Sequence, residues 1–231
     1  MKSALIATLA IFFVVTQSFA AENKSLQLKT AKDKTSYSMG MNVGTSFKQQ
    51  SIDINADIFM KGFKDALSGA KPLLTDDEMR SMILAVQKEV MAKQTEKMTA
   101  VAGKNKKEGE TFLAENMKKE GVKTLASGLQ YKVITEGTGK MPKATDTVTT
   151  NYRGTLVDGT EFDSSYKRGE PATFPVNGVI AGWTEALQLM KTGAKWQLFV
   201  PSNLAYGERG TGPIGPNAVL LFEVELISIK E

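Results

Sequence analysis

The sequence predicts an α+β protein in which an all-helical N-terminal region and a long connecting helix precede a twisted antiparallel β-sheet wrapped on one short helix. Two observations carry this prediction. Residues 21–123 contain a single proline, Pro72, and repeat their apolar residues at helical spacing. Six of the seven prolines follow residue 124, where apolar residues alternate instead. We therefore place a separate C-terminal domain over residues 124–231.

Residues 1–20 predict a signal peptide. Lys2 supplies a positive charge, residues 4–15 form an apolar run, and small residues precede a cleavage point after Ala20. The run is shorter than the ~20 residues that a bilayer-spanning helix needs, and we expect no transmembrane span in the mature chain. We expect export to the periplasm, outer membrane or surface of a Gram-negative bacterium. An uncleaved N-terminal anchor is the alternative.

The residue types that are missing limit the chemistry. The chain has no cysteine and no histidine, which excludes disulfides, a thiolate nucleophile, His-based triads and the commonest metal ligands. We expect no metal, no cofactor and no conventional acid–base catalysis. The formal net charge is only +4 and no aromatic residues stud a basic stripe, so no nucleic-acid partner is expected.

Two helices are predicted within a helical dimerisation domain over residues 21–74, at residues 35–50 and 56–68. Asn55 is a candidate N-cap of the second helix. Gly69 stands where a helix C-terminus favours glycine.

A long connecting helix is predicted over residues 75–123. Thr75 and Glu78 have the spacing of a capping box at its start. Residues 93–111 are polar on nearly every side, which is typical of a solvated spacer. The alternative is a helix that its two glycines in this stretch break into two, since each is unfavourable by about 1 kcal/mol relative to alanine.

The N-terminal helices carry more large apolar side chains than a region of about 60 residues buries well alone. These are Met39, Met41, Val43, Phe47, Ile58, Phe59, Met60, Phe63 and Leu67. Methionine adapts well to irregular helix interfaces. We therefore expect a homodimer in which the helices of two chains complete one core. A monomeric three-helix core is the alternative.

The C-terminal domain is expected to contain several strands around one helix, which favours an antiparallel sheet packed on that helix. The helix is predicted at residues 182–190. Asp158 and Gly159 signal a hairpin turn. The strands are predicted at residues 128–134, 147–156, 160–164, 196–201 and 219–229.

Five sequence blocks follow one another in this domain. They are NYRGTL at 151–156, DGTEFDSS at 158–165, VIAGW at 179–183, LAYG at 204–207 and LLFEVEL at 220–226. Together they resemble the FKBP-type peptidyl-prolyl cis/trans isomerases. The signal peptide, the Met-rich helices and the long polar helix further resemble the macrophage infectivity potentiator (Mip) subfamily. The resemblance implies an exported isomerase (rotamase) that assists the folding of extracytoplasmic proteins or acts on them. It also implies a virulence-associated surface protein as one possibility.

The implied reaction needs none of the missing residue types. Rotation about an X–Pro bond has a barrier of ~18–20 kcal/mol because amide resonance must be broken. A dry pocket favours the twisted amide, which is less dipolar than the planar one, and hydrogen bonds that fit the twisted carbonyl add to this preference. The expected partners are therefore proline-containing polypeptides, and the resemblance adds macrolide inhibitors as candidate ligands.

The resemblance also implies the residues of the site. Asp163, Tyr206 and Tyr152 are the implied catalytic residues: Asp163 polarises the reacting region without transferring a proton, and the Tyr206 hydroxyl and the Ile180 N–H donate to substrate carbonyls. Trp183 is the implied floor under the proline ring. The implied substrate-binding residues are Phe162, Val179, Ile180, Trp183, Ile214, Phe222 and Arg168. Taken singly, the aromatic residues would be ordinary core residues, and Arg168 either a partner of Asp163 or a solvated charge.

Two features depart from the family pattern. Ala172 stands where many members carry an aromatic residue, and the loop over residues 208–215 is short and rich in glycine. Both bear on the preference before proline and on macrolide affinity. Two other functions stay open: a proline-peptide-binding chaperone or adhesion module with incidental turnover, and a helical spacer that carries an inactive domain.

Overall fold

The structure is a computed structural model that describes residues 27–230. The expected signal peptide at residues 1–20 lies outside the described residues. The chain divides into two compact units between Ile54 and Asn55. Within the described range, no helix is long and apolar enough to cross a membrane.

The first unit contains α1 (Ala31–Gln49). Thr30 and Asp33 form a capping box at its start, because each side chain accepts a hydrogen bond from the other residue's backbone N–H. The helix therefore begins at Ala31, four residues before the predicted start at residue 35. All of α1 is described, and it contains no buried residue.

The predicted ends of α2 (Ala56–Ser68) are confirmed. Asn55 accepts hydrogen bonds through Oδ1 from the N–H groups of Asp57 and Ile58, at 3.0 and 3.1 Å. Gly69 ends the helix with a φ of 67°, a left-handed conformation that glycine adopts without strain. Both signals act locally, so the sequence alone locates this helix.

The long helix α3 (Asp76–Asn116) is continuous over 41 residues. The capping box of Thr75 and Glu78 is present at its start. Neither Gly103 nor Gly109 interrupts it, so the alternative of two helices with a joint is wrong.

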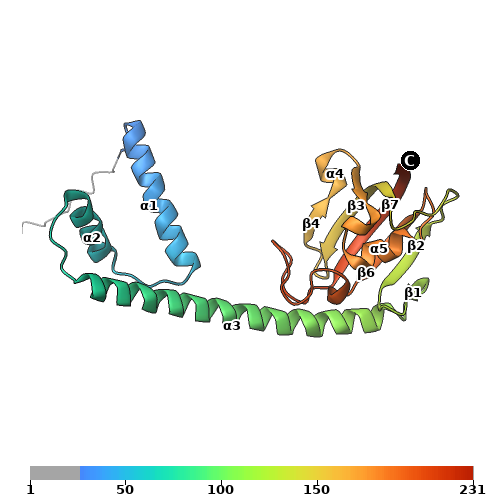
Figure 1. The fold of residues 1–231 in the computed structure, drawn as a ribbon, viewed down its shortest axis with the longest axis horizontal. Helices are drawn as coiled ribbons and strands as arrows, with labels where there is room; N and C mark the ends of the chain where they lie inside the picture. Colours follow the sequence, from blue (N-terminus) through green and yellow to red (C-terminus); the bar gives the residue numbers. More distant parts are fainter. Residues whose placement is uncertain (1–26, 231) are drawn as a thin grey trace, which may run out of the picture. The chain divides into compact units, whose positions relative to one another are not determined.

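After α3 the chain forms one seven-stranded sheet with the strand order β1-β2-β6-β7-β3-β4, and β5 pairs with β3 (Figure 1). All the strand pairings of this sheet are antiparallel. The strands are β1 (Val122–Thr124), β2 (Gln130–Thr135), β3 (Thr147–Leu156), β4 (Glu161–Ser164), β5 (Ala172–Pro175), β6 (Lys195–Val200) and β7 (Leu220–Lys230). Five of them match the predicted strands, whereas β1 and β5 are additions to the prediction.

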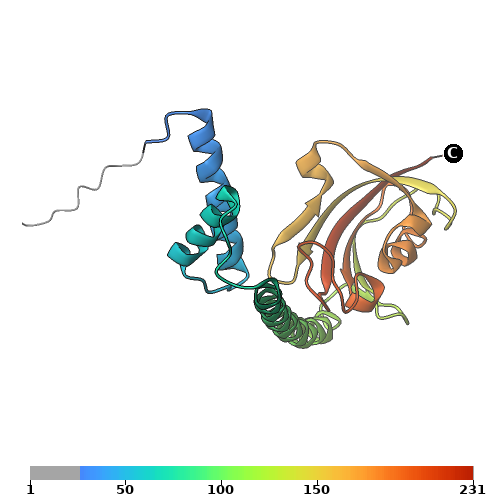
Figure 2. The same cartoon turned by 60° about the vertical axis from the view of Figure 1, so that its left-hand side comes forward.

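The helix α5 (Ala181–Leu187) lies on one face of this sheet (Figures 1 and 2). Gly182 permits the close approach, since a Cβ there would lie 2.5 Å from Cγ1 of Val200. Shorter turns are α4 (Ser165–Arg168), η1 (Val176–Gly178) and η2 (Ser202–Leu204). The fully buried side chains between helix and sheet include Leu129, Val148, Leu187, Met190, Leu198, Leu220, Val224 and Leu226. The predicted α+β fold class is confirmed.

The last turns of α3 pack against the sheet. Asn116, which is 1% exposed, donates through Nδ2 to Oε1 of Gln130 at 2.9 Å. Gln130 in turn donates to the carbonyl of Leu113, also at 2.9 Å. The ring centroids of Phe112 and Phe199 lie 6.0 Å apart.

About two turns before Asn116, Gly109 is buried against Val219, the residue that precedes β7. A Cβ at this position would lie 2.6 Å from Cγ2 of Val219, so only glycine fits without a shift. Ala102 and Asn105 are half-buried on the same side. The prediction that residues 93–111 form an exposed spacer is therefore wrong for their C-terminal part. There the polar helix packs against the C-terminal domain.

Candidate active site

Four aromatic side chains from four elements meet on the α5 side of the sheet. The ring centroid of Trp183 in α5 lies 5.2 Å from those of Tyr152 in β3 and Phe222 in β7, with ring planes at 88° and 80°. Phe162 in β4 lies 5.6 Å from Phe222, also edge to face. This arrangement is the favourable one for aromatic pairs. All four were among the implied site residues, and the structure brings them together.

Gly154 explains how two of these rings reach the same place. It lies in β3, opposite Asp163 of β4. A Cβ at this position would lie 2.7 Å from Cζ of Phe162 and 2.9 Å from Cε1 of Phe222. The absence of a side chain on β3 therefore makes room for both rings.

Phe174 is a fifth member of the cluster that the sequence analysis missed. Its ring centroid lies 5.6 Å from that of Trp183 and 6.3 Å from that of Tyr152. It comes from β5, whose other inward residue, Ala172, is partly buried against the same core. The alternation over residues 172–175 was the one available signal, and a strand of four residues is too short to show it clearly.

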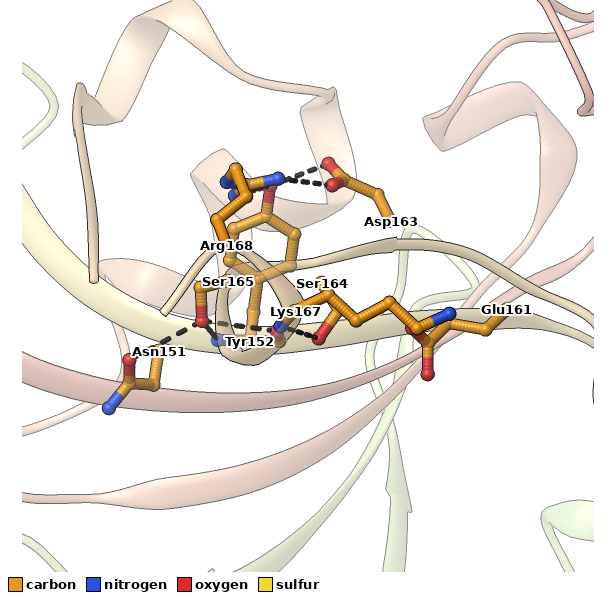
Figure 3. Close-up of polar contacts among 8 residues, drawn as sticks. All are labelled: Asn151, Tyr152, Glu161, Asp163, Ser164, Ser165, Lys167 and Arg168. Atoms are coloured by element: carbon orange, nitrogen blue, oxygen red, sulfur yellow. Dashed lines mark hydrogen bonds and ion pairs between the residues drawn. The ribbon is translucent and has the colours of Figure 1, made fainter. Parts of the chain in front are cut away.

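Tyr152 of the aromatic cluster also belongs to a polar group with Asp163 and Arg168 (Figure 3). The Tyr152 hydroxyl donates to Oδ2 of Asp163 at 2.5 Å, and Nη1 of Arg168 donates to Oδ1. Nη2 of Arg168 donates to the Tyr152 hydroxyl oxygen at 2.8 Å. Each of the three residues thus contacts the other two, and Arg168 is a partner of Asp163 and not a solvated charge.

These contacts set the charge states of the group. Burial would raise the pKa of Asp163, but the hydrogen bonds from Tyr152 and Arg168 and the charge of Arg168 hold it below its ordinary value. Burial and the hydrogen bond to Asp163 raise the pKa of the Tyr152 hydroxyl. Asp163 is therefore a carboxylate and Tyr152 a neutral phenol at neutral pH. The group supplies a fixed charge and not a mobile proton.

Ser165, a second residue that the sequence analysis did not select, holds the backbone beneath this group (Figure 3). Its Oγ, fully buried, accepts a hydrogen bond from the N–H of Tyr152 at 2.9 Å. The hydroxyl also lies 3.3 Å from Oδ1 of Asn151. It couples the turn α4, which carries Arg168, to the strand that carries Tyr152.

Val179 and Ile180 lie between η1 and α5, and both are partly buried against the core that includes Trp183. The carbonyl of Ile180 accepts hydrogen bonds from the N–H groups of Trp183 and Thr184 at 2.9 and 3.0 Å. Among the described residues, the N–H of Ile180 donates no hydrogen bond. A donor next to the aromatic cluster is therefore left for another acceptor.

The remaining implied residues lie on the loop between η2 and β7. Ile214 is buried in the core cluster, 6% exposed. Tyr206 is 41% exposed at the start of the loop, and its carbonyl accepts a hydrogen bond from Gly210. Thr211 and Ile214 exchange backbone hydrogen bonds at 2.8 Å, which closes the tip into a tight turn. In the described residues, no group of three or more acidic residues is arranged to hold a metal ion.

Comparison with known proteins decides the family. The profile described as "FKBP-type peptidyl-prolyl cis-trans isomerase" matches residues 138–227, and that of the "domain amino terminal to FKBP-type peptidyl-prolyl isomerase" matches residues 32–133. The chain is 49% identical over 232 residues to "Outer membrane protein MIP" of Legionella longbeachae, covering 100% of this chain and 99% of that protein. This chain belongs to the FKBP-type peptidyl-prolyl isomerases.

Other members of the FKBP-type isomerases agree with this assignment. "Peptidyl-prolyl cis-trans isomerase Mip" of Coxiella burnetii is 50% identical, over 88% of this chain and 89% of that protein. The crystal structure of FkpA from Escherichia coli superposes with a TM-score of 0.69 at 39% identity, covering 88% of this chain and 99% of that chain. The expected Mip-like FKBP assignment and enzyme class are confirmed.

Proposed function

We propose that this FKBP-type isomerase is exported and rotates X–Pro bonds in proteins outside the cytoplasm. The observation that supports this most directly is the aromatic cluster around Trp183 with the ionised Asp163 at its side. An apolar site disfavours the planar amide, because amide resonance makes the planar form the more dipolar one. The rotation requires no bond to a nucleophile, which suits a chain without histidine and cysteine.

In this proposal the proline ring lies against the indole of Trp183. Trp183 is 4% exposed and fixed by rings on three sides, so it offers a rigid apolar surface. The walls of the site are Tyr152, Phe162, Val179, Ile214 and Phe222. A rigid surface of this kind binds the ring without first losing side-chain entropy.

Two donors orient the substrate chain in this proposal. The N–H of Ile180 supports the first role, because its donor capacity is unused among the described residues. The hydroxyl of Tyr206, a residue that is 41% exposed, supplies the second. Donors that fit the carbonyl of the twisted amide better than that of the planar one lower the barrier by differential binding.

Asp163 acts through its charge. Arg168 and Tyr152 keep its pKa low, so it stays ionised at neutral pH and has no proton to transfer. Its field acts on the amide as the charge distribution changes during rotation. Tyr152 and Arg168 keep the carboxylate in one orientation and so belong to the same unit.

The test is a proline-isomerisation assay on short peptides that differ in the residue before proline. Asp163→Leu and Tyr206→Phe are each expected to lower kcat/KM by on the order of tenfold, which is about 1.4 kcal/mol of transition-state stabilisation. Asp158→Asn, a change in the exposed hairpin turn, is the matched control and should leave kcat/KM unchanged. Native protein that matches the uncatalysed rate while still binding the peptide would favour the chaperone alternative.

The helical region supports a homodimer through the N-terminal helices. Ile58, Phe63 and Leu67 on α2 are 68%, 52% and 75% exposed in the single chain. All residues of α2 are described, and none is buried. An apolar surface of this extent marks a protein–protein contact, and a second copy of the chain provides a matching one.

The dimer is tested by replacing its apolar surface. Leu67→Glu combined with Ile83→Glu changes side chains that are exposed in one chain, so the fold of each chain should persist. Sedimentation analysis is expected to give a dimer for the native mature protein and a monomer for the double variant. Lys64→Glu on α2 is the control and should stay dimeric. A monomeric native protein would end the dimer proposal.

Export to the periplasm or cell surface rests on the signal-like residues 1–20 and on the name of the Legionella relative, an outer membrane protein. Protease treatment of intact cells distinguishes the two locations. A surface protein is digested without lysis, and a periplasmic one only after the outer membrane is opened. Recovery of uncleaved protein in the cytoplasm would contradict export.

Macrolide inhibitors are a proposed ligand of the same aromatic cluster. Binding should change the fluorescence of Trp183 and displace a proline-containing peptide. Because Ala172 replaces an aromatic wall of many relatives, we expect Ala172→Phe to tighten macrolide binding. Unchanged fluorescence at saturating macrolide would exclude this ligand.

A further inference from the structure

Helix α3 contacts the loop over residues 206–219, which carries Tyr206 and Ile214. Nδ2 of Asn105 donates to the carbonyl of Pro216 at 2.8 Å. In the opposite direction, Nδ2 of Asn217 donates to the carbonyl of Ala102 at 3.4 Å. Helix and loop thus exchange two hydrogen bonds across 111 and 115 residues of sequence.

Two glycines make this approach close enough. Gly215 faces the helix, where a Cβ would lie 3.0 Å from Nδ2 of Asn105 and 3.3 Å from Cγ1 of Val101. Gly109 receives Val219 one turn further along α3. Each side of the contact therefore contributes one position without a side chain.

The contact holds the base of the loop, at Pro216 and Asn217. Pro216 is buried, and Asn217 has a φ of 56° with its N–H donating to the carbonyl of Gly207 at 2.9 Å. That bond joins the two ends of the loop. On the N-terminal side of Asn105, residues 91–102 of α3 line an open groove of about 390 Å³ together with Glu208 and Pro216. Pro216, which Asn105 holds, therefore lies between Ile214 and a backbone hydrogen bond that reaches Gly207, the neighbour of Tyr206.

We propose that Asn105 is a positioning residue of the isomerase site, which holds the loop over residues 206–219 in the conformation that binds the substrate. This inference rests on the proposed function. Asn105 does not touch the substrate; it acts through Pro216 on Ile214 and Tyr206. The long helix is in this way a part of the isomerase machinery and not only a connection to it.

The test uses the full mature protein with Asn105→Ala and Asn105→Asp. Aspartate has nearly the same shape but no N–H to donate, so both variants lose the bond to Pro216. We expect KM for an X–Pro peptide to rise about three- to tenfold, as for one net hydrogen bond, with kcat reduced less. Lys106→Ala, the exposed neighbour on α3, is the control and should behave as native protein.

A second measurement separates positioning from general stability. Backbone amide exchange should speed up at residues 208–217 in both Asn105 variants and stay unchanged in the strands. Asn105→Gln, which keeps a donor, should recover part of the native exchange rates and KM. Native KM, native kcat and native loop exchange in Asn105→Ala would overturn the inference. If the native protein lacks turnover, the proposed function fails, and peptide titration with loop exchange still decides the role of Asn105.

Discussion

The two parts of α3 differ in what they contact. From residue 101 to Asn116 the helix is joined to the isomerase domain by hydrogen bonds and by close packing. Before residue 100 its large apolar side chains point to solvent, with Ile83 59% and Met91 68% exposed. One continuous helix therefore completes a domain at one end and presents an uncovered apolar surface at the other. The second situation is the one that the proposed homodimer resolves.

The surroundings of the two glycines of α3 differ in the same way as the two parts of the helix. Gly103 has no atom within 4 Å of the place where a Cβ would be, whereas at Gly109 a Cβ would lie 2.6 Å from Val219. Each glycine weakens the helix by about 1 kcal/mol relative to alanine. At Gly109 the packing against β7 offsets that loss. At Gly103 nothing in the described chain does.

The largest expected effect comes from filling these two positions. Gly109→Leu should lower the free energy of unfolding of the isomerase domain by about 2–3 kcal/mol, because the new side chain overpacks against Val219. Gly103→Leu should raise helix stability by a few tenths of a kcal/mol or more, because leucine is the better helix former. Denaturant unfolding followed by tryptophan fluorescence reports on this domain, since Trp183 and Trp196 both lie in it.

Equal results for the two glycine variants would break the comparison. They would mean that the helix lies free of the sheet along its whole length. Far-ultraviolet circular dichroism of both variants is the control for helix content, which should be native or higher in each.

A smaller effect is expected where α3 ends. Asn116→Ala leaves the buried Oε1 of Gln130 without its donor, which should cost about 1–2 kcal/mol of unfolding free energy. Glu115→Ala, the exposed neighbour, should change it by less than about 0.5 kcal/mol. Sedimentation should find both variants dimeric if the association surface lies before residue 100. Dissociation caused by Asn116→Ala would place that surface at the wrong end of the helix.

The parts of the fold that the sequence predicted well are those with local causes. Asn55 and the pair Thr75 and Glu78 cap their helices through residues two or three positions away, so the helix starts can be found in a short window. β1 and β5 depend on pairing with β2 and β3, which supply the missing stability from far along the chain. Strands of three and four residues carry too little alternation to be found alone.

The residues of the site also fall into those that the sequence predicted and those that it did not. The implied residues came from the blocks of sequence that resemble FKBP-type isomerases, and the structure gathers the aromatic ones around Trp183. Phe174, Ser165 and Asn105 were missed, because their roles come from tertiary contacts. Asn105 is the extreme case: it lies in the stretch of α3 that is polar on nearly every side, where nothing local distinguishes it from a solvated residue.

The smallest effect is expected from pH, and it separates a fixed charge from a mobile proton. Because the pKa of Asp163 is lowered, its carboxylate persists through the mildly acidic range, and activity should fall only as pH drops below about 4. Because the pKa of Tyr152 is raised, its hydroxyl stays protonated at alkaline pH above its ordinary value of about 10. We therefore expect kcat/KM to be flat between about pH 5 and about pH 9 after subtraction of the uncatalysed rate. A bell-shaped profile centred near neutral pH would require a titrating acid or base in the site, and would contradict a mechanism that rests on the charge of Asp163.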